Sequence, residues 1–264
     1  MRDYRDIGNL VYLGGNGGYW RVARHPQDGT LEIRRTEGGV RTWESAPGEY
    51  YSAFDGSYGG LWRRNNRPPQ QLFGVGFASQ GSFTGMPYKR VCFDSRFDWV
   101  FDGIDTDILG DFGFSGGGKP FRNFSSRIFC HAFLMTVHIP SNPFVFVFIL
   151  SHLSEGAAGF ELDRVDPRLD GGLDIVILAQ SFPKDQKKFI LVPEEVLTQF
   201  TNVSNESEDE AKRADMVYAE TPNGGRVFSV GSITFCGSLP WNDYDNNIST
   251  ILHNVIRRFT SPGC

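Results

Sequence analysis

The chain has 264 residues, 40% of them hydrophobic and 14% aromatic, so it can bury a full core in one or two domains. Lys and Arg number 26 against 31 Asp and Glu, a formal net charge of −5. With no basic stripe, this balance argues against a nucleic-acid partner. The four cysteines have no paired spacing, which indicates neither a zinc site nor a disulfide framework. The charged amino terminus predicts no signal peptide, and no apolar run is long enough to span a membrane, so we expect a cytoplasmic protein.

The first predicted strand covers residues 10–13 and stops at the glycine-rich turn 14–18, Gly-Gly-Asn-Gly-Gly. Glycine accepts backbone conformations that other residues resist, so this turn marks the carboxyl end of a buried strand. Ligands of open α/β sheets bind at that edge, which makes Tyr12, Asn16 and Tyr19 candidate site residues. The glycine spacing fits neither the dinucleotide nor the phosphate-loop pattern. A purely structural turn is the alternative interpretation.

Two short strands at 21–25 and 30–35 follow, joined by a turn. Residues 38–64 show neither helical nor alternating periodicity and are rich in aromatic residues, which predicts a long ordered loop. We expect this loop to pack over the strand end that carries Tyr12; the alternative is a small aromatic core of its own. Its aromatic residues include Trp43, Tyr50, Tyr51, Phe54, Tyr58 and Trp62.

Residues 119–154 differ in composition from their surroundings, because they contain no Asp, Glu or Gly. The three histidines of this segment have spacings that match no metal-ligand pattern. We therefore predict an insertion outside the core. Its exposed apolar run at 144–150 is prone to aggregation, so excising the segment is expected to raise the soluble yield.

The remaining chain predicts more regular elements. The β-branched run at 173–179 is typical of a strand buried on both faces. Residues 216–220 and 226–235 predict a hairpin around a Thr-Pro-Asn-Gly-Gly turn. Residues 247–259 predict a helix with one apolar stripe, capped by Asn246 or Asn247. Together these elements predict an α/β core of mainly parallel strands with an irregular aromatic loop between 36 and 90.

Several blocks of the sequence resemble the large (beta) subunit of N,N-dimethylformamidase, and the resemblance covers nearly the whole chain except 119–154. The blocks include Tyr-Leu-Gly-Gly-Asn-Gly (12–17), Arg-Thr-Trp-Glu-Ser-Ala-Pro-Gly-Glu-Tyr-Tyr (41–51), Gly-Phe-Glu-Leu-Asp-Arg (159–164) and Glu-Thr-Pro-Asn-Gly-Gly-Arg-Val-Phe-Ser-Val-Gly-Ser-Ile (220–233). The resemblance implies a glutamine-amidotransferase-like, flavodoxin-like α/β domain over residues 1–264. It also implies that the family's preceding β domain and first catalytic strands are missing from this sequence.

The resemblance further implies a mononuclear iron site, since members of that family hold iron through two tyrosines and a glutamate and hydrolyse a small formamide. By position, Tyr12 matches the first tyrosine, Tyr50 or Tyr51 the second, and Glu161 the glutamate. Phenolate and carboxylate oxygens suit an oxidised iron, Fe3+, that acts as a Lewis acid and activates water. A second carboxylate, Glu220 or Asp163, would accept the proton of the water.

The sequence thus predicts an iron-dependent hydrolase of small amides whose partner is a small-molecule amide substrate. A homo-oligomer or a small-subunit partner is an open alternative to a monomer. The competing hypothesis is a non-catalytic binding or structural homologue, or an inactive fragment. A Cys-His-Glu amidotransferase is disfavoured, because the sequence has no nucleophile elbow around a cysteine.

Overall fold

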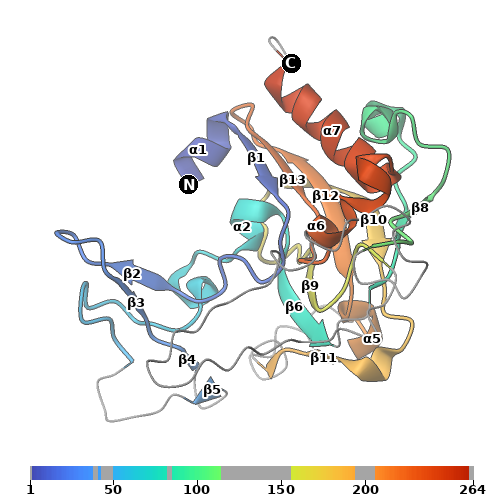
Figure 1. Cartoon of the computed structure of the whole chain (residues 1–264). Coiled ribbons are helices and arrows are strands. Elements are labelled where there is room, and N and C mark those ends of the chain that lie inside the picture. The colour runs from blue at the N-terminus through green and yellow to red at the C-terminus, as the bar shows by residue number, and fades with distance from the viewer. Residues whose placement is uncertain are drawn as a thin grey trace, which may run out of the picture.

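A computed structural model of the chain describes residues 2–37, 41–42, 50–81, 85–113, 156–193 and 206–261 (Figure 1). The insertion expected at 119–154 lies entirely outside these residues. Its placement outside the core and the effect of excising it therefore stay predictions.

The larger of two main sheets has six strands in the order β1-β13-β12-β10-β7-β8. The β1 strand pairs with β13 in parallel, whereas β13, β12, β10, β7 and β8 follow one another in antiparallel pairs. The strands are β1 (Asn9–Tyr12), β13 (Arg226–Ser229), β12 (Ala214–Glu220), β10 (Asp174–Ser181), β7 (Tyr88–Arg90) and β8 (Ile108–Leu109).

The expectation of a glutamine-amidotransferase-like, flavodoxin-like sheet of mainly parallel strands is wrong for this chain. The hairpin of β12 and β13 is confirmed, and its short turn at 221–225 forces the two strands to be antiparallel. The run at 173–179 forms the strand β10 as expected, but Ile175, Val176 and Ile177 are only half-buried, and the strand is antiparallel to both of its neighbours. A continuous apolar run identifies a buried strand without fixing its direction, which is why the sequence pattern misled.

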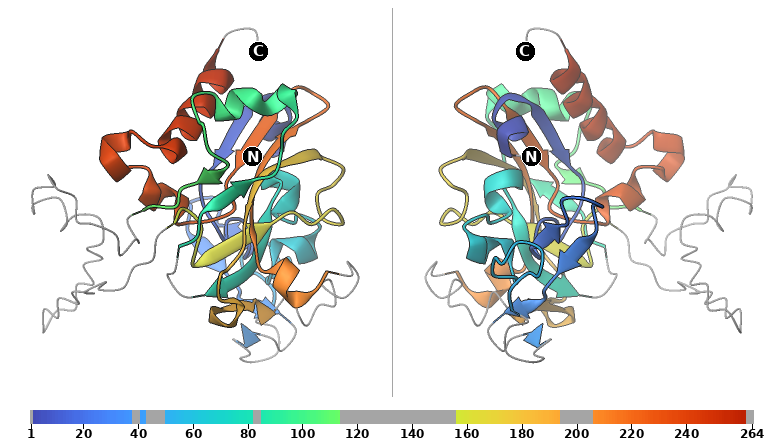
Figure 2. Two further views of the ribbon diagram at one scale, coloured as in Figure 1. Left: turned by 90° about the vertical axis from the view of Figure 1, so that its right-hand side faces the viewer. Right: turned by 90° about the vertical axis from the view of Figure 1, so that its left-hand side faces the viewer.

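A second sheet of three antiparallel strands, β11-β6-β9, lies beside the first (Figure 2). It consists of β11 (Phe189–Leu191), β6 (Gly76–Gly81) and β9 (Glu161–Arg164). The expected early strands form the hairpin of β2 (Val22–Arg24) and β3 (Leu31–Ile33), followed by β4 (Thr36–Glu37) and β5 (Arg41–Thr42). The region between 36 and 90 is therefore more regular than predicted, because it also contributes β6 and β7.

Most helices of the described residues are short, with three to seven residues each. They are α1 (Arg2–Ile7), α2 (Gln70–Phe73), α5 (Glu208–Ala211) and α6 (Phe235–Ser238), with 3-10 helices at Trp62–Asn65, Ser95–Phe101, Gln186–Lys188 and Trp241–Tyr244. The long helix α7 (Asn247–Thr260) confirms the predicted helix, and the Asn246 side chain accepts a hydrogen bond from the Ser249 amide as its cap. None of these helices has the length and apolar character that crossing a bilayer requires.

The hydrophobic core occupies both faces of the larger sheet. On one face Met216 and Tyr218 of β12 pack toward α7, whose residues Ile251 and Val255 are buried. On the other face Val217 of β12 packs in a cluster with residues of α2 and β1. Side chains of a strand alternate between faces, so β12 contributes to both clusters. The sheet is thus covered by α7 on one side and by α2 on the other (Figure 1).

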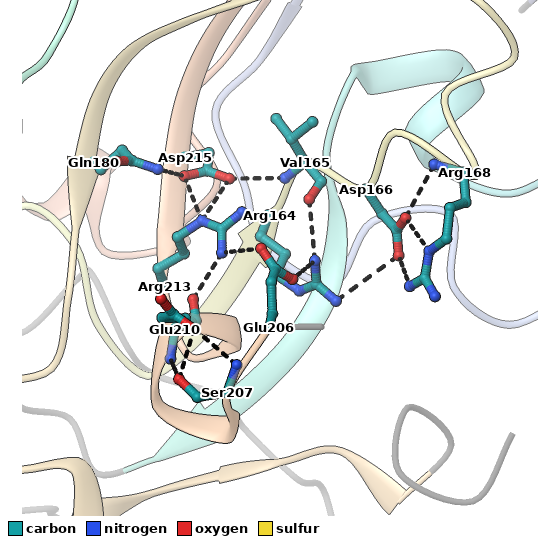
Figure 3. Close-up of polar contacts among 10 residues, drawn as sticks. All are labelled: Arg164, Val165, Asp166, Arg168, Gln180, Glu206, Ser207, Glu210, Arg213 and Asp215. Carbon is teal, nitrogen blue, oxygen red and sulfur yellow. Dashed lines mark hydrogen bonds and ion pairs between the residues drawn. The ribbon is translucent and has the colours of Figure 1, made fainter. Parts of the chain in front are cut away.

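Buried ion pairs tie β9 of the smaller sheet to β12 of the larger one (Figure 3). The fully buried Asp215 accepts hydrogen bonds from the Val165 amide at 2.8 Å and from Arg213 Nε at 3.0 Å. Arg213 and Arg164 each donate to one oxygen of Glu206, both at 2.9 Å. Charges this deeply buried are stable only while each one keeps its partners.

We expect Asp215→Ala to lower the free energy of unfolding by about 3–5 kcal/mol, because it leaves the Arg213 guanidinium buried beside an unpaired Val165 amide. Urea unfolding followed by circular dichroism measures the change. The matched control is Asp105→Ala, since Asp105 is exposed. A loss at Asp215 no larger than that of the control would contradict the structural role of this carboxylate.

Candidate functional site

Tyr12 is the last residue of β1, and its ring packs against the side chain of Phe73 in α2. The Tyr12 and Phe73 rings stack with centroids 4.2 Å apart, which fixes the plane of the phenol. Tyr19, the other aromatic candidate of this stretch, is buried and packs edge-on against Phe77 at 5.2 Å. Tyr12 therefore presents its hydroxyl to neighbouring polar groups, while Tyr19 serves the packing of a second aromatic cluster.

The glycine-rich turn folds back over the Tyr12 hydroxyl. This hydroxyl donates a hydrogen bond to Asp163 Oδ2 at 3.0 Å and accepts one from the Gly17 amide at 2.7 Å. A Cβ atom on Gly17 would lie 2.6 Å from the hydroxyl oxygen, so a side chain there would displace it. Close approach of backbone to phenol thus explains this glycine, as the sequence pattern suggested in general terms.

Asn16, at the tip of the turn, contacts both carboxylates of β9. Its backbone amide donates to Asp163 Oδ1 at 2.8 Å, and its side-chain Nδ2 donates to Glu161 Oε1 at 3.2 Å. Gly15 brings the turn this close, because a Cβ atom there would lie 3.1 Å from Glu161 Cβ. The turn after β1 and the strand β9 therefore form one hydrogen-bonded cluster of Tyr12, Asn16, Glu161 and Asp163, which we call the Tyr12 cluster.

The local structure of β9 explains why both carboxylates face the turn. Glu161 and Asp163 are two residues apart on a strand and so point to the same side, whereas Leu162 points to the core. The strand is held in place because the Asp163 amide donates to the Gly231 carbonyl at 2.8 Å. Leu162 also forms a bridge with Ser232. These contacts between the two sheets therefore fix the position of both carboxylates relative to Tyr12.

Burial dominates the electrostatics of the Tyr12 cluster. Desolvation raises the pKa of Asp163 to about 7, against the opposing hydrogen bonds from Asn16 and Tyr12. Burial, followed by repulsion from the Asp163 carboxylate, raises the pKa of Tyr12 far above its usual value. Burial also raises the pKa of Glu161. The cluster thus favours the protonated, uncharged forms of these groups.

Among the described residues, the candidates Tyr50 and Tyr51 contact residues outside this hydrogen-bonded cluster. Tyr51 is 54% exposed, and its ring packs edge-on against Tyr58 at 5.7 Å. The Tyr50 carbonyl accepts a hydrogen bond from the Gly59 amide at 2.7 Å. Within the described residues, no hydrogen bond joins either tyrosine to the Tyr12 cluster.

Glu220 lies toward the other end of the larger sheet. Tyr12 pairs with Ser229 of β13, and Ser229 pairs in turn with Val217 of β12. Glu220 is three residues further along β12, about 10 Å from that level. Its carboxylate accepts a hydrogen bond from the Tyr218 hydroxyl at 2.6 Å. Of the two candidate proton acceptors, only Asp163 belongs to the Tyr12 cluster.

The donor atoms of the Tyr12 cluster are suited to a hard cation. Its side chains offer phenol, carboxylate and amide oxygens, the ligand types that oxidised iron and other hard cations prefer. In the described part of the chain, no group of three or more His, Cys, Asp or Glu residues could hold a metal. A cation at this place would therefore depend on Tyr12 together with Glu161 and Asp163.

The sequence connected these residues only in part. Tyr12, Asn16, Glu161 and Asp163 were each recognised, but nothing in the sequence joined Asn16 to Glu161, which is 145 positions away. The alternation Glu161-Leu-Asp163 on a strand was a usable signal, because it places both carboxylates on one face. The sequence pattern did not single out Asp215, because the residues next to a carboxylate in a strand do not indicate its ion-pair partners.

Fold and site thus define a protein with a mixed sheet and a buried tyrosine–carboxylate cluster under a glycine-rich turn. The chain matches the family described as N,N-dimethylformamidase beta subunit-like, C-terminal, over residues 1–121 and 138–246. It belongs to this family. The match is interrupted over residues 122–137, within the segment expected to be an insertion.

Two relatives show how much of the family's length this chain spans. It is 34% identical over 260 residues to the N,N-dimethylformamidase beta subunit of Paracoccus aminophilus and 33% identical over 260 residues to that of an Alcaligenes species. Each alignment covers 96% of this chain but 28% of the relative. The chain therefore spans a little over a quarter of the length of these relatives.

We expect the chelator-treated protein to lose stability as pH rises from about 4 to 7 through Asp163. Its pKa is raised in the folded state from 3.8 to about 7, so the folded chain holds a proton that the unfolded chain releases. The free energy of unfolding, measured by urea titration at several pH values, should fall across this window. Asp163→Asn should flatten that slope, whereas the exposed control Asp105→Asn should leave it. If the free energy of unfolding of Asp163→Asn depended on pH as in the wild type, the raised pKa of Asp163 would be contradicted.

Proposed function

We propose that this chain contributes the catalytic region of a hydrolase that acts on small amides. The family membership supports this proposal, because both relatives are named N,N-dimethylformamidase beta subunits. The observation that carries it is the Tyr12 cluster, in which Tyr12, Glu161 and Asp163 converge from strands of two different sheets. The names of the relatives also support a further subunit as a partner.

The proposed cofactor is a mononuclear iron, Fe3+, held by Tyr12 and Glu161 with Tyr50 or Tyr51 as a further ligand. When bound, such a cation acts as a Lewis acid toward an amide carbonyl and a water molecule. The Tyr12 hydroxyl is protonated in the arrangement described, because burial and Asp163 oppose its ionisation. A cation beside it would reverse that balance and favour the phenolate.

Asp163 is the group best placed to accept a proton in this reaction. It already accepts the Tyr12 hydroxyl proton as a hydrogen bond at 3.0 Å, and it is the carboxylate that the sheet register keeps in the cluster. The Asn16 amide holds its other oxygen at 2.8 Å. The position of Glu220 near the far end of β12 weakens the proposal that its carboxylate accepts the proton of the water.

A non-catalytic homologue is the second candidate function. The exposed position of Tyr51 favours it, since this tyrosine packs against Tyr58 and, within the described residues, no hydrogen bond joins it to the Tyr12 cluster. Iron content and amide turnover separate the two candidates.

We expect Tyr12→Phe to reduce amide hydrolysis by at least about tenfold, because it removes a proposed ligand while the ring keeps its stacking on Phe73. Release of amine from formamide and N,N-dimethylformamide measures turnover, and elemental analysis measures iron. The visible phenolate-to-iron charge-transfer band of the iron-loaded protein should weaken as well. The control is Tyr244→Phe, at a tyrosine 65% exposed.

If the purified protein retains no iron and hydrolyses none of these amides, alone or with added Fe3+, the hydrolase proposal fails and the non-catalytic function remains. Normal turnover in Tyr12→Phe would instead keep the hydrolase and remove Tyr12 from its site.

A further inference from the structure

A groove of about 470 Å³ runs along the outer face of α7, the face turned away from the larger sheet (Figure 2). Its lining includes Leu239 from the loop before the helix and Ser249, Leu252, His253 and Ile256 of α7, and we call it the α7 groove. Leu252 and Ile256 lie one turn apart on the same face, and Ile256 is 46% exposed. A helix whose inner face already fills the core therefore presents a second apolar stripe to solvent.

The wall of the α7 groove is held in place by hydrogen bonds. The Leu239 carbonyl accepts one from the Ser249 hydroxyl at 2.7 Å and one from Asn246 Nδ2 at 3.0 Å. Asn246 Nδ2 also donates to the Trp241 carbonyl at 2.6 Å. Residues 242–244 have φ values between 52° and 68°, a left-handed conformation that persists in such residues only where surrounding contacts fix it. The groove is therefore formed before any partner binds.

Charges of opposite sign lie at the two ends of this surface. Asp243 and Asp245 are exposed just before the first turn of α7, and Arg257 is exposed in its last turn. Within the described ranges, the side chains of these three residues form no ion pair or hydrogen bond. The next residue, Arg258, instead lies over the Trp99 ring at 5.7 Å. Both signs also suit the dipole of the helix, so the apolar stripe between them is what points to a partner.

The pattern is complementary to itself. When two copies of α7 pack antiparallel about a two-fold axis, the acidic end of each helix meets the basic end of the other. Asp245 and Arg257 are about 18 Å apart along the helix axis, and their midpoint in the sequence is residue 251. The two-fold axis then passes beside Leu252, which packs against its own copy, and Ile256 enters the groove near Leu239 of the other copy. One arrangement thus pairs the charges and covers the apolar stripe.

We propose that the α7 groove is the contact between two copies of this chain, in which Asp245 of each copy pairs with Arg257 of the other. The contact is separate from the proposed catalytic site, because Tyr12 packs on the opposite face of the larger sheet. A contact between two helices is small for a specific interface, so we expect a dissociation constant of about 10–100 µM.

Reciprocal charge reversal tests the proposal. Arg257→Asp and Asp245→Arg are made in separate full chains, and sedimentation equilibrium measures self-association. Each variant alone brings like charges together at both contacts, so its dissociation constant should rise by at least about tenfold. An equimolar mixture of the two variants restores opposite charges at both contacts and should dimerise as wild type does. The control, Lys184→Glu, reverses an exposed charge between β10 and β11 and should change nothing.

Ile256→Gln tests the apolar stripe independently of the charges. Its side chain is partly exposed in the single chain, so the variant is expected to fold, which circular dichroism checks. Two isoleucines lose burial in the dimer, and the dissociation constant should rise by at least about fivefold.

A wild type that stays monomeric well above the expected dissociation constant would overturn the inference and leave the groove to a different partner. A dimer that neither Ile256→Gln nor the charge reversals weaken would form through another face, which also overturns it. If the single reversals weaken the dimer but their mixture does not restore it, the antiparallel pairing is wrong. If a charge-reversal variant does not fold, wild type and Ile256→Gln decide.

Discussion

The buried carboxylate of Asp163 is the constraint on which the candidate site depends. One of its oxygens accepts the Tyr12 hydroxyl and the other accepts the Asn16 amide, so a single side chain joins β9 to the end of β1 and its turn. A carboxylate without exposed surface needs both bonds, because burial disfavours its charged form. Moving the turn or the strand would expose this carboxylate or break its hydrogen bonds. The positions of Tyr12, Asn16 and Glu161 are therefore fixed relative to one another.

The junction between the two sheets places that carboxylate. Asp215 of β12 holds the Val165 amide directly after β9, and the Gly231 carbonyl holds the Asp163 amide. The ion pairs of Arg213 and Arg164 with Glu206 extend the same junction. Charged groups therefore have two roles in this chain. Ion pairs between residues of opposite charge hold the two sheets together, whereas the Tyr12 cluster contains carboxylates and no basic side chain among its members.

Local elements of the fold could be predicted from the sequence. The strand before the glycine turn, the hairpin around residues 221–225 and the helix with its Asn246 cap all follow from short-range patterns. The direction of β10 could not, since strand direction depends on how distant segments connect. In the candidate site, Tyr12, Asn16, Glu161 and Asp163 were each foreseeable as candidates, but the hydrogen bonds that join them were not.

What the sequence determined by itself is the chemistry available here: phenols, carboxylates, an amide, and glycines that let a backbone approach them. These depend on residue type and on neighbours within a few positions. Tertiary structure alone decided which of them meet. The register of β1, β13 and β12 keeps Glu220 away from Tyr12, and the pairing of distant segments brings Asp163 to it. Packing of strands far apart in the chain is a collective balance of burial and hydrogen bonding, and no local pattern contains it.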